Sequence, residues 1–316
     1  MKKKWPSSVK RFVMTLVFLT VAGVVAAGCG NGSGAFVHED RLHLTTTVGM
    51  IADVAEQIGG DRVEVIGLMG PGVDPHTYKA SQGDIAKLES AHIILYGGLY
   101  LEGKLTEILE KMGKDKPVVP VTRDIPEERL LSEEEDGAFD PHVWFDVRLW
   151  MIAVETIRDV LIENDPAHES EYRERADAYL AKLDELDRYA REQIASIPEQ
   201  GRVLVTAHDA FGYFGDAYGI EVVGLQGIST AAEYGSKDVR SLRDMLIERG
   251  IKAVFVESSV SSKSLEAVIE GAKQQGHEIR IGGELFSDAM GEAGTEEGTY
   301  IGMFKHNVDT IVEALQ

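Results

Sequence analysis

The sequence is nearly free of cysteine, with a single one among 316 residues. A disulfide framework is therefore excluded, and so is any metal or iron–sulfur site built from several thiolates. Positive charge is also scarce, because 32 Lys and Arg face 53 Asp and Glu and leave a net charge of −21. A nucleic-acid partner requires clustered cations, so that class of function is excluded as well. The nine histidines become the main candidates for chemistry.

Residues 1–28 predict a secretory signal peptide that is not part of the fold. A cationic segment (residues 2–11) precedes an apolar stretch (residues 12–25) that is too short to span a membrane. The tripeptide Ala-Ala-Gly then precedes Cys29, an order that resembles a bacterial lipobox, in which the cysteine is acylated and becomes the mature N-terminus. Residues 29–38 are expected to form a lipid-anchored, flexible tether. The alternative is an ordinary signal peptide with an incidental cysteine.

The remaining chain predicts an α/β fold of two lobes. Short apolar strands alternate with helical segments in both halves, which indicates a parallel sheet of about four strands with flanking helices in each. The predicted strands occupy residues 43–48, 62–68, 91–96, 117–121, 202–207, 221–225, 252–257 and 278–281. The predicted helices lie near residues 50–59, 82–90, 100–113, 209–218, 236–249, 262–275 and 297–315, and a further one starts near Asp146. We expect an N-terminal lobe (39–165), a linking helix (166–198) and a C-terminal lobe (199–316).

The linking helix is predicted from apolar residues that recur every three or four positions between Pro166 and Pro198. About thirty helical residues span roughly 45 Å, the length of a small domain. The apolar stripe contains alanines and tyrosines instead of regular leucines, so we expect it to pack along both lobes and not to form a coiled-coil arm. One stiff helix joining two lobes would permit only small hinge motions.

The tripeptide Asp-Pro-His occurs twice, ending at His76 and at His142. With nine His and nine Pro in the chain, chance predicts only about 0.3 Pro-His pairs. Proline restricts its own backbone and that of the preceding residue, which suits a ligand that must arrive preorganised. A repeated turn with exposed imidazoles is the alternative.

Two further side chains complete a candidate metal site. His208 follows the strand at 202–207 and His76 follows the strand at 62–68, and ligands of parallel sheets bind outside the carboxyl ends of strands. Asp288, after the last predicted strand, supplies an oxygen donor. Three imidazoles and one carboxylate suit a first-row divalent ion, with two ligands from each lobe.

Other residues have lesser roles in this interpretation. Glu257, at the end of the strand at 252–257, is the reserve ligand in place of Asp288, and Glu284 is a weaker reserve. Carboxylates that adjoin the ligands are expected either to orient an imidazole or to form turns; they are Asp74, Asp140 and Asp209. Aromatic residues expected near the site, or simply in the core, are Trp144 and Phe211. The histidines interpreted as structural or superficial are His38, His43, His92, His168, His277 and His306.

Four ordered segments together resemble a known family. They are Gly-Val-Asp-Pro-His-Thr-Tyr (72–78), Asp-Pro-His-Val-Trp-Phe-Asp (140–146), Thr-Ala-His-Asp-Ala-Phe-Gly-Tyr-Phe (206–214) and Leu-Phe-Ser-Asp-Ala-Met (285–290). This order is similar to that of the zinc- and manganese-binding substrate-binding lipoproteins of metal-importing ABC transporters.

The resemblance implies a monomeric binding protein and not an enzyme. One ion of Zn²⁺ or Mn²⁺ would lie in the cleft on His76, His142, His208 and Asp288, as cargo for a permease with a cytoplasmic ATPase. The protein would be exported and lipid-anchored at the outer face of the cytoplasmic membrane or in the periplasm. Some lipoproteins of this family are proposed adhesins, but no host ligand is specified by this sequence.

The sequence leaves the metal open between zinc and manganese. Imidazole at His208 favours zinc, whereas members resembling dedicated manganese binders usually carry glutamate there. The long histidine-rich loop of many zinc-specific members is absent, and an acidic stretch (127–136) takes its place. The alternative function is a secreted zinc-dependent hydrolase. It lacks support, because the chain contains neither His-Glu-x-x-His nor Gly-x-Ser-x-Gly.

Overall fold

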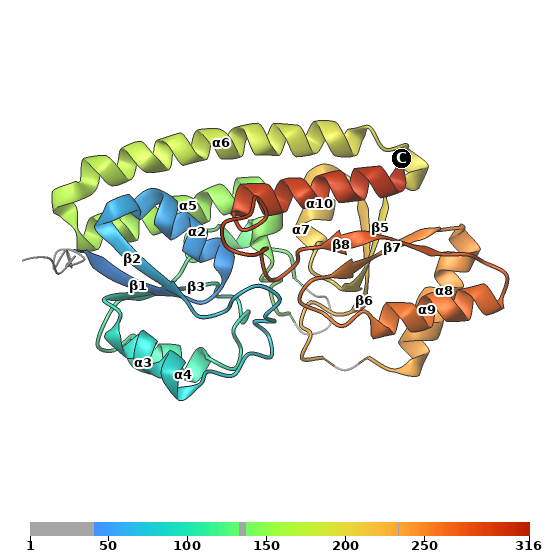
Figure 1. The fold of residues 1–316 in the computed structure, drawn as a ribbon, viewed down its shortest axis with the longest axis horizontal. Coiled ribbons are helices and arrows are strands. Elements are labelled where there is room, and N and C mark those ends of the chain that lie inside the picture. Colours follow the sequence, from blue (N-terminus) through green and yellow to red (C-terminus); the bar gives the residue numbers. More distant parts are fainter. Residues whose placement is uncertain (1–40, 133–136, 233) are drawn as a thin grey trace, which may run out of the picture. The chain divides into compact units, whose positions relative to one another are not determined.

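A four-stranded parallel sheet forms the centre of the N-terminal lobe in the computed structural model, which describes residues 41–132, 137–232 and 234–316 (Figure 1). The strand order is β2-β1-β3-β4, and every neighbouring pair is parallel. The strands are β1 (Leu42–Thr46), β2 (Val63–Gly67), β3 (Ile93–Tyr96) and β4 (Val118–Pro120). None of these four strands extends more than one residue beyond its predicted range. The prediction succeeds because each strand is a short apolar segment bounded by polar or turn-forming residues.

Helices cover both faces of this sheet. Figure 1 shows α2 (Gly49–Gly59) and α5 (Val147–Asn164) on one side, and α3 (Gln82–Ser90) and α4 (Thr106–Met112) on the other. The start of α3 is defined by a capping box, in which Ser81 and Asp84 exchange side-chain and backbone hydrogen bonds. The short 3-10 turns of the described residues are η1 (Gly60–Arg62), η2 (Glu127–Arg129), η3 (Val143–Phe145), η4 (Pro166–His168) and η5 (Glu199–Gly201).

The long helix α6 (Glu169–Ala195) runs along both lobes. It packs on α2 and α5 of the N-terminal lobe and on α7 (Gly212–Tyr218) and α10 (Tyr300–Leu315) of the C-terminal lobe. Its buried stripe is the predicted one, formed by Tyr172, Ala176, Tyr179, Leu183, Leu186, Ala190 and Ile194. At 27 residues the helix is about 40 Å long, and the expectation that it packs along both lobes is confirmed.

The C-terminal lobe contains two parallel strand pairs. The first pair is β5 (Val203–His208) with β6 (Glu221–Gln226), and the second is β7 (Ala253–Glu257) with β8 (Arg280–Leu285). Strand β5 also lies against β7, so the four strands are neighbours. The helices of this lobe are α7 (Gly212–Tyr218), α8 (Ser236–Arg249), α9 (Lys263–Gln274) and α10 (Tyr300–Leu315). The predicted two-lobed α/β class is therefore confirmed.

Two predicted boundaries were wrong by four residues or more. The helix expected at 100–113 begins only at Thr106, because Leu99 and Tyr100 have φ angles of 51° and 65°, which no right-handed helix contains. The last strand, expected at 278–281, runs from 280 to 285. Gly282 and Gly283 concealed its extent, because glycine is uncommon inside strands. Glycine is required at position 282, since a Cβ there would lie 2.8 Å from the Phe255 ring.

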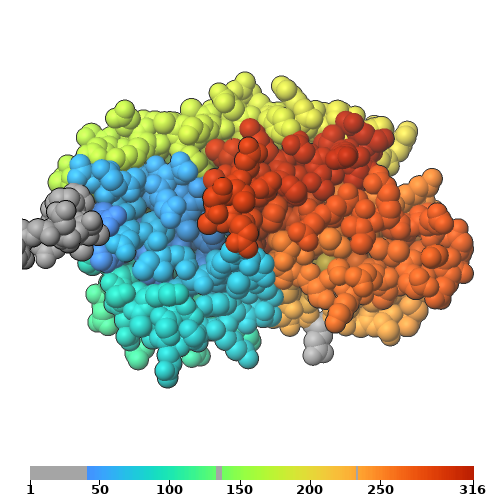
Figure 2. Space-filling model, in the orientation of Figure 1, coloured from blue at the N-terminus to red at the C-terminus, as the bar shows by residue number. Residues whose placement is uncertain are grey.

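The hydrophobic core crosses from one lobe to the other. One buried cluster joins residues of the N-terminal lobe, α6, α7 and α10, while a second cluster fills the C-terminal strands and their helices. The two lobes are also in direct contact on the face seen in Figure 2, where cyan and blue segments meet orange and red ones. A wide opening of the lobes would expose this shared core to water, so the packing favours small displacements.

Several predictions fall outside the described residues. These are the signal peptide (1–28), the lipidated Cys29, the tether (29–38), His38 and part of the acidic stretch, residues 133–136. Among residues 41–132, 137–232 and 234–316, no helix combines the length and the apolar character needed to cross a membrane.

Candidate metal centre

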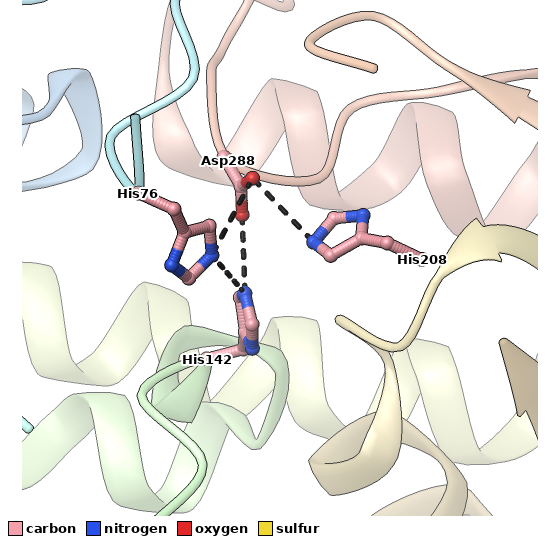
Figure 3. A group of neighbouring side chains, drawn as sticks. All are labelled: His76, His142, His208 and Asp288. Carbon is pink, nitrogen blue, oxygen red and sulfur yellow. Dashed lines mark hydrogen bonds and ion pairs between the residues drawn. The ribbon is translucent and has the colours of Figure 1, made fainter. Parts of the chain in front are cut away.

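Four buried side chains from four distant segments meet between the lobes (Figure 3). They are His76 in the loop after β2, His142 just before η3, His208 at the end of β5 and Asp288 in the loop after β8. Each side chain offers one donor atom, and these atoms all lie within 4.8 Å of one another. None of the four residues is more than 4% exposed. The structure thus brings together the full set of predicted ligands.

The donor atoms converge on the carboxylate of Asp288. Its Oδ1 lies 3.2 Å from Nε2 of His142, and its Oδ2 lies 3.5 Å from Nε2 of His208 and 3.9 Å from Nε2 of His76. The Nε2 atoms of His76 and His142 are 3.2 Å apart. Within the described part of the chain, neither Asp288 oxygen has a hydrogen bond of good geometry. A buried carboxylate without such bonds costs about 1–3 kcal/mol or more, and a bound cation would remove that cost.

Asp140 orients the ring of His142. Its Oδ1 accepts hydrogen bonds from both the backbone N–H of His142 (2.9 Å) and ring Nδ1 (2.7 Å). The proton therefore resides on Nδ1, and Nε2 is left to face Asp288. Burial alone would lower the pKa of His142, but Asp140 and Asp288 outweigh it and raise the pKa to about 9.

Glu257 lies beside Nδ1 of His208 from a neighbouring strand, as an ion pair without the hydrogen-bond geometry that Asp140 has toward His142. Its Oε2 lies 2.5 Å from Nδ1 of His208, and its Oε1 accepts the backbone N–H of the same residue at 2.9 Å. The carboxylate thus lies on the Nδ1 side of the His208 ring, and Glu257 is not one of the four donor side chains. Burial opposes protonation of His208, but Glu257 and Asp288 hold its pKa well above the usual range. Burial also acts to raise the pKa of Asp288, yet the neighbouring histidines hold it well below its usual range.

His76 differs from the other two histidines because burial dominates its titration. Desolvation, only partly offset by Asp288, lowers the pKa of His76 to about 4. Its backbone is held by Asp74, whose Oδ1 accepts the N–H of His76 at 2.9 Å. The other oxygen of Asp74 accepts hydrogen bonds from Thr77 (2.8 Å) and from Thr230 of the C-terminal lobe (2.7 Å). Asp74 thus links the His76 loop to the opposite lobe.

Aromatic residues connect the two loops that carry His142 and Asp288. The indole N–H of Trp144 donates to the carbonyl of Ser287 at 3.1 Å, and the hydroxyl of Tyr300 donates to the carbonyl of Trp144 at 2.7 Å. The ring of Trp144 lies edge-on to His142, with centroids 5.2 Å apart. The ring of Phe211 stacks on the ring of Phe145, with their centroids 4.4 Å apart.

The remaining described histidines lie elsewhere, as predicted. The rings of His43 and His92 contact each other, with centroids 4.9 Å apart. The other three are bound to nearby acceptors: His168 to Asp165 (2.6 Å), His277 to the Ile251 carbonyl (2.7 Å) and His306 to the Glu284 carbonyl (3.1 Å). The side chain of Glu284, the weaker reserve ligand, is on the exposed face of β8.

Sequence reasoning did not identify two contacts of the site. It placed Glu257 at the correct strand end but could not tell that the carboxylate points back toward Nδ1 of His208. Thr230 was not considered at all, because a lone threonine in a loop carries no recognisable pattern. Asp209, suggested as an orienting residue, donates its backbone N–H to the Gln226 carbonyl at 3.0 Å.

The chain is similar to known metal-binding proteins over most of its length. The family model described as zinc-uptake complex component A, periplasmic (ZnuA) matches residues 44–314. The manganese-binding lipoprotein MntA of Bacillus subtilis is 54% identical over 289 residues, which cover 92% of this chain and 94% of that protein. The zinc-binding protein TroA of Treponema pallidum is 50% identical over 284 residues, or 90% of this chain and 92% of the relative.

Solved structures show the same fold. The periplasmic zinc-binding protein TroA from Treponema pallidum superposes with a TM-score of 0.85 and 50% identity, covering 87% of this chain and 99% of that one. The Fe(III)-bound YtgA from Chlamydia trachomatis gives a TM-score of 0.77 at 31% identity, covering 87% and 98%. With a family match over nearly all of the described residues and relatives at half identity, the chain belongs to the ZnuA family of periplasmic zinc-uptake components.

Proposed function

We propose that this chain captures one divalent transition metal ion, Zn²⁺ or Mn²⁺, outside the cytoplasmic membrane and delivers it to an ABC-type importer. The observation that carries the proposal is the buried group of three imidazoles and one carboxylate, with all donor atoms within 4.8 Å of one another. The ion is the cargo of the protein and not a cofactor.

The chemistry of the donor set supports a divalent metal. Asp140 and Glu257 hold the proton on Nδ1 of His142 and His208, so that each presents the Nε2 lone pair to the ion. Asp288 adds the negative charge that a hard or borderline cation requires. His76 and His142 come from the N-terminal lobe, and the other two donors from the C-terminal lobe. A bound ion would therefore hold the two lobes together.

The same geometry disfavours the zinc-dependent hydrolase. A catalytic zinc usually has three protein ligands and an open position for water, whereas four protein donors surround this position. The family is described as a zinc-uptake component, and a relative at 30% identity is named as the substrate-binding lipoprotein of a manganese ABC transporter. We therefore assign no catalytic residue.

The proposal includes export and membrane attachment. Residues 1–28 would be removed, Cys29 would carry the lipid, and residues 29–38 would tether the lobes at 39–165 and 199–316, joined by the helix at 166–198. The names of several relatives as lipoproteins support this arrangement. The partners would be a permease and its cytoplasmic ATPase, which bind the protein as a monomer.

The two relatives near half identity are named for different metals, so similarity does not select the cargo. His208 in the donor set favours zinc over manganese, because imidazole is the softer ligand. However, zinc binds more tightly than manganese at nearly any such site, so affinity alone does not identify the physiological ion.

The test is a competition titration of the chelator-stripped mature chain, from Gly30 onward, with Zn²⁺ and Mn²⁺ against a chromophoric chelator. We expect one tight equivalent, strongly weakened by His208→Ala and retained by His43→Ala, which removes an exposed histidine outside the site. Absence of a saturable equivalent of either metal, or unchanged affinity in His208→Ala, would contradict the proposal.

A further inference from the structure

A cavity separate from the metal centre lies in the N-terminal lobe, and metal binding does not explain it. Its volume is about 730 Å³, and none of the four metal donors lines it. Its walls are the first turns of α4, the loops at the carboxyl ends of β3 and β4, and residues 137–139. A cavity of this size matches sites for drug-sized molecules or for inserted side chains, whereas a single metal ion requires far less space.

The rim of this cavity presents a tyrosine on a strained backbone. Tyr100 is 80% exposed, and both it and Leu99 have left-handed φ angles, which cost about 1–2 kcal/mol per residue outside glycine. The loop is held by the buried carboxylate of Glu102, which accepts hydrogen bonds from Thr47 (2.5 Å) and from the backbone N–H of Gly97 (2.7 Å). Exposed tyrosines are enriched at protein interfaces, and strained backbone is concentrated at functional sites, so this loop has two features of a recognition surface.

The charge of the cavity selects the kind of partner. Its described walls are largely apolar, and Leu109, Ile125 and Phe139 are among them. The acidic residues Glu110 and Glu127 also line it, while the cation Arg123 is already paired with Asp124 at 3.2 Å. An apolar side chain next to lysine or arginine would therefore complement the cavity in both shape and charge.

The wall of the cavity continues directly into the metal site. Phe139 lines the cavity, and Asp140, the residue that orients His142, follows it. Asp140 donates its backbone N–H to the carbonyl of Leu131 (2.8 Å), and its own carbonyl accepts the hydroxyl of Tyr213 (2.9 Å). One short segment thus forms both the cavity wall and the support of a metal donor, so an occupant of the cavity contacts the structure that positions His142.

We propose that this cavity is the docking site for an extracytoplasmic loop of the permease, which inserts an apolar side chain while neighbouring basic residues face Glu110 and Glu127. The inference rests on the proposed function, because it requires a delivery partner. The connection to His142 favours a delivery partner over an unrelated small ligand. A delivery partner must release the metal, which requires a contact that is coupled to the metal site, whereas an unrelated ligand has no such requirement.

The experiment compares charge reversals on one helix. Glu110→Lys changes a residue of the cavity, whereas Glu107→Lys makes the same change on α4 at an exposed residue that does not line it. Cells of the native host that lack the chromosomal gene are complemented with each variant, and radiolabelled zinc and manganese uptake is measured at saturating metal. We expect Glu110→Lys to lower the uptake rate about tenfold, with unchanged metal affinity of the purified protein, and Glu107→Lys to match wild type. Tyr100→Ala should reduce uptake as Glu110→Lys does.

The other outcomes would overturn the inference. Normal uptake in both Glu110→Lys and Tyr100→Ala would show that the permease does not use this cavity. Equal losses in Glu110→Lys and Glu107→Lys would indicate a general effect of charge, and a parallel loss of metal affinity would place the effect at the metal site. If the wild-type protein itself restores no uptake, the proposed function fails, and this failure is separate from the other results.

Discussion

Glu257→Gln provides a sharp test of how the metal site is held. The two oxygens of Glu257 face two donors of one residue, the backbone N–H and ring Nδ1 of His208. Glutamine has only one oxygen, so its NH₂ group must face one of these donors. If the NH₂ faces the ring, Nδ1 must lose its proton, and Nε2 then carries the proton and cannot bind metal.

The expected loss can be compared with that at Asp140. Replacing a carboxylate that orients a metal-binding histidine typically weakens metal affinity 10–100-fold, or about 1.4–2.7 kcal/mol. In Asp140 a single oxygen, Oδ1, accepts both the backbone N–H and Nδ1 of His142. Asparagine can retain that oxygen in place, so Asp140→Asn should weaken binding by less than about tenfold. The structure therefore predicts a larger loss in Glu257→Gln than in Asp140→Asn.

The assay is the competition titration with a chromophoric chelator, applied to both variants and to wild type, with circular dichroism to check the fold. Equal or reversed losses in the two variants would refute the reasoning from oxygen placement. A loss in Glu257→Gln clearly larger than that of His208→Ala would instead indicate that Glu257 binds the metal itself, as the reserve assignment from the sequence allowed.

Three further predictions concern pH, metal removal and the contact between lobes. At neutral pH a metal ion must displace a proton from His142, whose pKa is raised to about 9, and one from His208, whose pKa is held well above its usual range. Apparent affinity should therefore rise toward pH 9 by up to about tenfold per pH unit for each displaced proton, and a flat profile above pH 7 would contradict this. Free metal at a hundredfold excess over Kd adds about 2.7 kcal/mol to the free energy of unfolding. Removing the metal with a chelator should therefore lower Tm by about 5 °C or more in calorimetry. An unchanged Tm would contradict a metal site that exists only in the folded protein. Thr230→Val removes the 2.7 Å hydrogen bond to Asp74, worth about 1 kcal/mol, and should speed metal dissociation about fivefold in stopped-flow chelator trapping. Thr77→Val, which removes a bond to the same oxygen from within one lobe, should have a smaller effect, and equal rates in both variants would argue against a role for the lobe contact.

The sequence alone predicted the donors of the site because they occur in recognisable settings. His76 and His142 end a repeated Asp-Pro-His motif, and His208 comes directly after the largely apolar segment at 202–207. Asp288 depended more on the family resemblance, since a lone aspartate after a strand has many ordinary uses. The strand alternation likewise sufficed for the α/β class, because short apolar strands and amphipathic helices have different periods.

Other features depend on tertiary contacts that no local pattern reveals. The direction of the Glu257 side chain depends on β5 and β7 lying against each other, which brings Glu257 to His208 although the two residues are 49 positions apart in the sequence. The start of α4 is delayed by the backbone of Leu99 and Tyr100, which is held by a hydrogen bond between Glu102 and Thr47 on another strand end. Such contacts override the helical propensity of the residues involved.

The proposed function requires that His76, His142, His208 and Asp288 together bind the metal. The most direct measurement is a crystal structure of the metal-loaded mature protein with anomalous diffraction at the absorption edge of the bound metal. We expect one anomalous peak between the four side chains, about 2.0–2.2 Å from the three Nε2 atoms and from an oxygen of Asp288. A peak elsewhere, or one bound by Glu257 in place of Asp288, would contradict it.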